Sequence, residues 1–303
     1  MPSGTMSPAG IAHAEELADV PLISPSTTTG LLEVFRRRYL LRLLVRREIQ
    51  ARYQGSVLGM VWSYVNPLSQ FLIYYFVVGV IMNLHEDVEN FAIHIFCGLI
   101  IVHFFNETAN AGTRSIVRNK GLVQKMALPR EMFPVASMLV SAFHIGPQLV
   151  ILGIACTIIG WDPTATGFAA AVLALVLTMV MGTAVALLLS AANVFMRDIS
   201  NAVNILTNVV RFGVPMIYPY TLVEERFGSA AQYYLWNPLA DAVLLMQEAF
   251  WVPTTEEPAV TAHEHLPANL WTMGFITLGA ALVLLAIGQL VFSKLENKIP
   301  ERL

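Results

Sequence analysis

Charged side chains are scarce in this chain. Of its 303 residues, 13% are Asp, Glu, Lys or Arg, whereas 56% are hydrophobic. Because soluble domains carry about a quarter charged residues, this composition excludes an ordinary water-soluble protein and favours one that is solvated by lipid. Cysteine is also rare. Cys97 and Cys156 both lie within apolar runs, which predicts small buried residues and excludes a disulfide framework.

Catalytic and nucleotide-binding motifs are missing as well. The sequence contains no HExxH, no CxxC pair, no Ser/His/Asp cluster and no GxxxxGK[ST] phosphate loop. Its seven histidines are scattered along the chain. We therefore predict no catalytic residue, no metal site and no cofactor in this chain. If ATP drives the protein, another chain must bind the nucleotide.

Long apolar stretches are plentiful, and six of them can span about 30 Å of hydrocarbon at about 1.5 Å per residue. They cover residues 58–82, 91–112, 132–159, 168–195, 202–220 and 270–292. The sequence thus predicts an all-α membrane protein with six transmembrane helices, formed by residues 31–303. Residues 1–30 contain no Lys or Arg and no signal-peptide core, and they predict a flexible N-terminal tail.

Lysine and arginine are concentrated on one side of these predicted spans. The cations on that side are Arg36, Arg37, Arg38, Arg42, Arg46, Arg47, Arg52, Arg114, Arg118, Lys120, Lys125, Arg130, Arg197, Lys294, Lys298 and Arg302. On the other side lies only Arg226, and Arg211 falls within a span. Since cytoplasmic loops carry the excess of Lys and Arg, we expect a multi-pass protein of the bacterial inner membrane with both termini in the cytoplasm.

Two segments do not fit the plain pattern of spans. Residues 31–52 have a helical pattern in which Arg38, Arg42 and Arg46 share one face. This predicts an amphipathic helix along the inner leaflet, and a simple anchor attracted to anionic lipid is the alternative.

The second segment is the long outer stretch 221–269. Asn237 and Pro238 form a good N-cap and first turn before an apolar run, 239–251, that is too short to cross. We interpret it as a short helix dipping into the outer leaflet, with Trp236, Phe250 and Trp251 at the interface. A helix lying on the outer surface remains the alternative.

Polar residues recur at helical spacing within the spans. The stripes are Ser56, Gly59, Ser63, Asn66, Gln70 and Tyr74 in the first span, His103, Glu107, Asn110 and Arg114 in the second, Ser137, Ser141, His144 and Gln148 in the third, and Asn201, Asn204, Asn208 and Arg211 in the fifth. Hydrogen bonding between helices explains the third stripe. For the first and fifth, a water-filled conduit would supply the partners these groups need. Arg211 is either a functional residue at mid-membrane or one half of a buried ion pair with Glu107.

Short motifs carry a resemblance to a known family. They read RYQGSVLGMVW at 52–62, NP at 66–67, NKGLV at 119–123, LPRE at 128–131, FMRD at 195–198, PMIYP at 215–219 and NP at 237–238. In this order the chain resembles, over about residues 30–300, the permeases of type-2 ABC exporters, and more narrowly those exporting lipid-linked polysaccharides such as O-antigens and teichoic acids. The tail and the stretch 253–267 depart from the family pattern.

The resemblance implies a homodimer of permeases without enzymatic activity of their own, driven by separate ATPase subunits that bind ATP and Mg. The first, second and fifth spans would enclose the conduit, and the outer short helices would be re-entrant. The coupling helix that docks on the ATPase would comprise Asn119, Lys120, Gly121, Leu122, Val123, Gln124 and Lys125.

The expected function is export of a polyprenyl-diphosphate glycan. Its diphosphate would be met at the inner leaflet by Arg38, Arg42, Arg46 and Arg52, because Arg suits bidentate phosphate contacts. The expected conduit residues are Ser63, Asn66, Gln70, Tyr74, Asn204, Asn208 and Arg211, together with the aromatic residues Trp62 and Tyr218. Aromatic rings offer faces along which sugars slide, although ordinary packing also explains each ring.

Two other functions are compatible with the sequence. A permease for drugs or small lipids would share the same scaffold. A membrane-embedded transferase would need an acid or base at an aqueous loop, and Asp241 with Glu248 is the modest candidate pair. The glycan itself is not identified, since galactan, O-antigen, teichoic acid and capsule exporters all fit.

Overall fold

The computed structural model describes residues 30–56, 59–83, 88–126 and 128–303. Within these ranges the regular elements are helices, which confirms the all-α class. The predicted tail 1–30 lies outside the described residues except for Gly30. Five described segments are long and apolar enough to cross a membrane: Trp62–Ile81, α6 Phe91–Arg118, α8 Met132–Ile159, α9 Ala165–Phe195 and α14 Leu270–Glu296.

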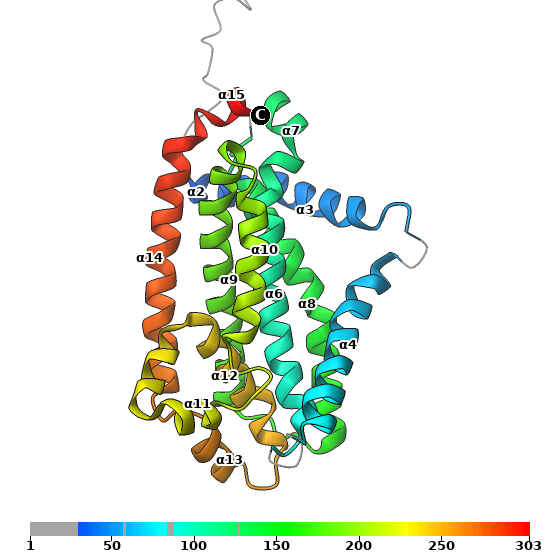
Figure 1. Cartoon of the computed structure of the whole chain (residues 1–303). Helices are drawn as coiled ribbons and strands as arrows, with labels where there is room; N and C mark the ends of the chain where they lie inside the picture. Colours follow the sequence, from blue (N-terminus) through cyan, green and yellow to red (C-terminus); the bar gives the residue numbers. More distant parts are fainter. Residues whose placement is uncertain (1–29, 57–58, 84–87, 127) are drawn as a thin grey trace, which may run out of the picture.

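Helices α6 and α9 form the centre of the bundle (Figure 1). α9 packs on α6 and α14, and α6 also packs on α8. The contact between α6 and α9 is close, because a Cβ added at Gly112 would lie only 2.4 Å from the Cβ of Ala186. Small residues at such contacts let membrane helices approach each other. The two central helices are thereby fixed against each other.

The first predicted span is a composite helix. A 3-10 turn, η1 Gly59–Val61, leads into α4 Trp62–Tyr74, and a π-helical stretch, η2 Tyr75–Ile81, completes it. α4 packs on α6, whereas much of its apolar surface, including Leu68 and Ile73, is exposed. In Figure 1 it stands at the edge of the bundle. One side of this span is therefore available to lipid or to a second protein.

The fifth predicted span is shorter than expected. α10 runs from Ile199 to Phe212, and α11 Tyr220–Phe227 follows after a non-helical stretch, so the prediction of one helix reaching Tyr220 is wrong. Pro215 lacks an N–H, and a proline disfavours helical backbone in the residue before it. The 14 residues of α10 extend about 21 Å. α10 by itself is shorter than the hydrocarbon core.

The predicted interfacial helix lies across the end of the bundle (Figure 1). It consists of α2 Leu31–Arg36 and α3 Arg38–Tyr53, which meet at Arg37. Val34, Leu41 and Leu44 are buried in a core shared with Phe133 of α8. The orientation crosswise to the spans agrees with the predicted amphipathic helix.

Short helices build the opposite end of the molecule. α12 Pro238–Phe250 begins where the Asn237 side chain accepts from Leu239 N at 3.1 Å. Leu244 and its neighbours are fully buried, because α12 lies against α6, α9 and α14. A helix on the outer surface does not fit this burial. Trp251, predicted at an interface, is only 1% exposed.

The remaining elements complete the two ends of the bundle. η3 Gly228–Trp236 and η4 Val252–Thr254 pack on α12, and α13 Pro258–His265 packs on η4 and α11. The opposite end carries α7 Lys120–Lys125 and the C-terminal α15 Ile299–Arg302 (Figure 1). We refer to these as the α12 end and the α7 end.

Candidate functional site: a polar network and an open polar face

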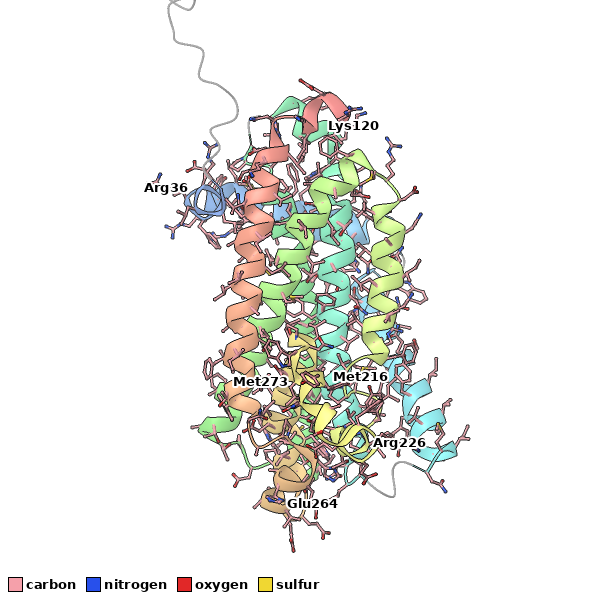
Figure 2. All side chains as sticks on the ribbon, turned by 60° about the vertical axis from the view of Figure 1, so that its left-hand side comes forward. Arg36, Lys120, Met216, Arg226, Glu264 and Met273 are labelled. Carbon is pink, nitrogen blue, oxygen red and sulfur yellow. The ribbon has the colours of Figure 1, made fainter. Side chains whose placement is uncertain are left out.

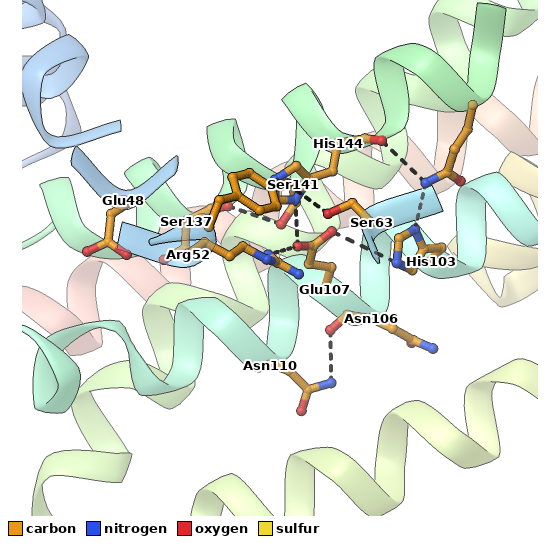
Figure 3. A network of polar contacts seen from close by, with 12 residues as sticks. Glu48, Arg52, Ser63, His103, Asn106, Glu107, Asn110, Ser137, Ser141 and His144 are labelled. Carbon is orange, nitrogen blue, oxygen red and sulfur yellow. Dashed lines mark hydrogen bonds and ion pairs between the residues drawn. The ribbon is translucent and has the colours of Figure 1, made fainter. Parts of the chain in front are cut away.

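Glu107 of α6 is the centre of a polar network that joins several helices (Figure 3). Its side chain is 8% exposed and pairs with Arg52, at the end of α3. His144 of α8 donates from Nδ1 to Glu107 Oε1 at 2.8 Å. A buried carboxylate is costly unless it is paired and hydrogen-bonded, and these two donors satisfy its Oε1 atom.

The network continues from His144 to the first span. A neutral imidazole that donates from Nδ1 accepts at Nε2, and the Tyr53 hydroxyl lies 2.7 Å from that nitrogen. Ser63 Oγ of α4 lies 2.7 Å from the same hydroxyl. On the far side of Glu107, Gln148 donates to His103 Nδ1 at 3.1 Å. The interfacial helix is thus connected to α4, α6 and α8.

The third stripe is confirmed only in part as bonding between helices. His144 and Gln148 make such bonds. Ser137 and Ser141 instead donate to carbonyl oxygens of their own helix, at 3.2 and 3.1 Å.

A polar cavity of about 250 Å³ adjoins the network. It is lined by Arg52, Tyr53, Ser56, Gly59, Trp62, Ser63, Asn66, His103 and Glu107. Among nearby buried oxygens of α6, Glu107 Oε2, Asn106 Oδ1 and Asn110 Oδ1 have no hydrogen-bond partner in the described structure. Cavities with several polar partners hold water. The cavity therefore suits hydrophilic groups at the start of the first span.

Arg211 does not pair with Glu107 in this structure. The carboxylate is engaged by Arg52 and His144 instead. Arg211 is half-buried on α10, and its Nε is buried without a hydrogen-bond partner among the described residues. Its donor therefore remains available for a ligand or for water.

The expected conduit residues are distributed over α4 and α10, which both pack on α6. Trp62, Asn66 and Asn208 are exposed, whereas Ser63, Gln70, Tyr74 and Asn204 are half-buried. Asn110 of α6 donates to Thr207 Oγ1 of α10 at 3.2 Å. The two polar stripes thus flank one central helix, and many of their side chains have no covering element within a single chain.

Tyr218 lies apart from the network, after α10. Its hydroxyl donates to Phe212 O at 2.9 Å and lies 3.1 Å from the Tyr234 hydroxyl. It lines an apolar cavity of about 470 Å³ at the α12 end, with Leu222, Val223, Phe227, Ala230, Ala231, Tyr233 and Tyr234. Trp62 and Tyr218, both predicted for the conduit, are therefore at different levels of the bundle.

The cationic residues of the interfacial helix are in two environments. Arg38, Arg42 and Arg46 are exposed on α3. Arg52 is 45% exposed but is held by Glu107. An anion at this helix would contact Arg38, Arg42 and Arg46 directly. It would have to compete with Glu107 for Arg52.

The predicted coupling segment forms α7 at the extreme end of the molecule, where Figure 2 labels Lys120. Lys120, Gly121, Gln124 and Lys125 are exposed, Leu122 is half-buried and Val123 is buried. The buried Asn119 accepts from Arg47 at 3.0 Å and donates to Glu48 at 2.9 Å. α7 is therefore tied to α3.

Sequence reasoning missed the link to Arg47 and Glu48 of α3. The opposite charges of these two neighbours are visible in the sequence, but nothing local pairs them with Asn119, 71 or 72 residues away.

Asp241 and Glu248 do not form a catalytic pair. Asp241 is fully buried and accepts from Thr277 Oγ1 at 2.8 Å. Glu248 accepts from Trp271 Nε1 at 3.0 Å. A general acid or base has to reach its substrate, and Asp241 faces α14 instead. Among the described residues, no group of three or more His, Cys, Asp or Glu side chains is arranged so that it could hold a metal ion.

Comparison with known proteins agrees with this architecture. The family model described as ABC-2 type transporter matches residues 39–251. The O-antigen export system permease protein RfbA of Klebsiella pneumoniae is 23% identical over 262 residues, which is 86% of this chain and 94% of that protein. RfbA of Myxococcus xanthus is 28% identical over 222 residues, 72% of this chain and 83% of the relative.

A further relative is the polysialic acid transport protein KpsM of Escherichia coli. It is 24% identical over 207 residues, 68% of this chain and 79% of that protein. Because the family model covers well over half of the sequence, this chain belongs to the ABC-2 transporter membrane family and is a multi-pass membrane protein.

Proposed function

We propose that this chain is the permease subunit of an ATP-driven exporter that moves a lipid-linked polysaccharide from the cytoplasmic to the outer side of the inner membrane. The match to O-antigen export permeases over 86% of the chain carries the proposal. In this arrangement both termini and the α7 end face the cytoplasm, in keeping with the excess of Lys and Arg there.

Two copies of the chain enclose the conduit, with their α4 and α10 faces turned towards each other. Asn66 and Asn208 are exposed on these faces. Polar groups that face lipid are costly, whereas groups that line a water-filled passage are not. The half-buried Arg211, with its unpartnered Nε, would then contact water or the passing glycan.

The diphosphate of the carrier lipid first meets Arg38, Arg42 and Arg46 on the exposed face of α3. Arg52 joins them when the diphosphate displaces Glu107, because a bidentate phosphate contact replaces the carboxylate contact. Release of Glu107 loosens the network around His144. Binding of the lipid head would in this way open the inner end of the first span.

The α7 segment docks on the ATPase subunit and passes its movement to α3 through Asn119. Reversing two exposed charges, Lys120→Glu with Lys125→Glu, should abolish stimulation of ATP hydrolysis and export while leaving membrane insertion intact. Lys294→Glu with Lys298→Glu makes the same charge change on exposed side chains of the same end and is the matched control. Normal export in the first variant would exclude α7 as the docking element.

Reconstitution tests the transport function itself. The permease, purified with its ATPase subunit, is placed in proteoliposomes with a radiolabelled polyprenyl-diphosphate glycan. We expect ATP-dependent accumulation of glycan on the opposite side, and a lower rate for Arg211→Ala at equal protein level. ATP-dependent transport of a small amphipathic drug without transport of the glycan would refute the proposal.

A further inference from the structure

Helix α11 separates two cavities at the α12 end. The first is the apolar cavity of about 470 Å³ that contains Tyr218, Tyr233 and Tyr234. The second, of about 650 Å³, is lined by Val88, Pro219, Thr221, Leu222, Glu225, His263, Glu264 and His265. Leu222 lines both cavities. An extended ligand can therefore contact both by crossing a single side chain.

The larger cavity has acidic and other polar groups in its lining. Thr221, Glu225, Glu264 and the two histidines supply a hydroxyl, two carboxylates and two imidazoles, and the described lining includes no Lys or Arg. Burial lowers the pKa of His265, so this imidazole is neutral at pH 7. The lining offers many acceptors and carries negative charge.

The wall of this cavity is anchored to the core of the protein. His265 Nδ1 lies 3.3 Å from Thr221 Oγ1, which joins α13 to α11. The His265 ring also lies 5.5 Å from the Trp251 ring, measured between centroids. Trp251 is buried and donates to Glu89 O at 2.7 Å. α13 is therefore held in place beside α11.

The two carboxylates of the cavity belong to exposed residues at the α12 end. Figure 2 labels Glu264 at the tip of the α12 end, with Arg226 to one side of it. Glu225 and Glu264 are exposed, and neither forms an ion pair with a cation among the residues that the structure describes. Arg226 follows Glu225 on α11 but does not line the cavity. Both carboxylates are thus free to accept hydrogen bonds from a ligand.

The apolar cavity supplies the complementary surface. Tyr233 is 69% exposed and Phe227 is 67% exposed. Rings of this kind have broad apolar faces, and tyrosine adds a polar hydroxyl. Sugar rings have one face of C–H groups and a rim of hydroxyls. The aromatic rings of the apolar cavity fit the C–H face of a sugar. The carboxylates of the larger cavity accept hydrogen bonds from the sugar hydroxyls.

We propose that the two cavities beside α11 form an outer holding site for a neutral glycan, and that Glu225 and Glu264 select against anionic glycans. Neutral hydroxyls donate to a carboxylate, whereas uronate, sialate or phosphate groups are repelled by it. The proposal rests on the export function proposed above and narrows its substrate class. α13 lies outside residues 39–251, the part of the chain that the family model matches.

Binding measured by saturation-transfer NMR tests the site. The probes are a neutral galactose pentasaccharide and a sialic acid pentasaccharide, each added at low salt to the permease–ATPase complex in zwitterionic nanodiscs. We expect the neutral probe to bind at least about tenfold more tightly. Glu225→Gln with Glu264→Gln should weaken it about tenfold, because hydrogen bonds to charged acceptors are the stronger ones. The same variant should bind the acidic probe more tightly than the unmodified protein does.

Glu256→Gln with Glu257→Gln is the matched control, because both residues are exposed and neither lines the cavity. This control should keep the preference for the neutral probe. Equal binding of both probes, or an unchanged preference in the Glu225/Glu264 variant, would overturn the selectivity. Normal glycan export without binding of either probe would refute the holding site alone. Selective binding without any ATP-dependent export would support the site and refute the export function.

Discussion

Arg52 and Glu107 are in contact but differ in how far each side chain is buried. This difference predicts the outcome of a double-mutant cycle. The Glu107 side chain is 8% exposed, whereas the Arg52 side chain is 45% exposed. Removing the guanidinium leaves a buried carboxylate with His144 as its close donor at 2.8 Å. Removing the carboxylate leaves a guanidinium that already reaches water.

The magnitudes follow from this difference in burial. Breaking a fully buried pair costs about 3–5 kcal/mol, and a hydrogen bond to a charged group contributes about 1.5–3 kcal/mol. Because Arg52 is half open to solvent, we expect Arg52→Gln to lower the free energy of unfolding by about 2 kcal/mol. Glu107→Gln should cost about 1 kcal/mol, since its amide still accepts from His144. The double variant should cost about 2 kcal/mol, which leaves a coupling of about 1 kcal/mol.

The assay is equilibrium unfolding of the purified protein in mixed micelles, followed by tryptophan fluorescence. Arg42→Gln removes an exposed cation from the same helix and should stay within about 0.5 kcal/mol of the unmodified protein. Additive single effects, with a coupling below about 0.3 kcal/mol, would show that the two side chains do not interact. An Arg52→Gln effect smaller than the Glu107→Gln effect would refute the argument from burial.

Three further predictions concern other parts of the molecule. Gly112→Ala should destabilise the protein by about 1–3 kcal/mol in the same unfolding assay through overpacking, because the added Cβ would lie 2.4 Å from Ala186 Cβ. Adding Ala186→Gly to this variant should restore most of the lost stability. Asn119→Ala removes two hydrogen bonds to α3 and should uncouple ATP hydrolysis from export in proteoliposomes, with a stability cost below about 2 kcal/mol. Burial lowers the pKa of His265 below its ordinary value of 6.5. Its protonation therefore costs the folded state nothing above pH 6.5 and destabilises it as the pH falls below that value. The melting temperature should therefore drop more between about pH 7.5 and about pH 5.5 in the unmodified protein than in His265→Gln, and equal drops would contradict the assignment.

Much of the fold follows from local pattern. The predicted span 132–159 has the same bounds as α8, because the length and composition of an apolar run depend only on neighbouring residues. The Asn237-Pro238 pair predicts a helix that begins there, and the structure shows the cap. The spacing of the arginines predicts the amphipathic helix α3. The motifs that occur in order along the chain indicate the family.

Other features were decided by tertiary structure. Pro215 was visible in the sequence, but membrane helices tolerate proline when neighbours satisfy the freed groups, so the end of α10 at Phe212 could not be located. The burial of α12 follows from its contacts with α6, α9 and α14. Periodicity shows that a residue is on a polar face, but not which helix that face meets.

The choice of a partner for Glu107 shows most clearly what the sequence determines and what the tertiary structure decides. The sequence by itself determined that an acidic residue lies within an apolar helix and therefore needs a cation or a hydrogen-bond donor. Only the tertiary structure selected Arg52, 55 residues away, in place of Arg211. The physical reason is that helical spacing is set by the backbone over a few residues, whereas the choice of partner depends on which of several distant helices pack together.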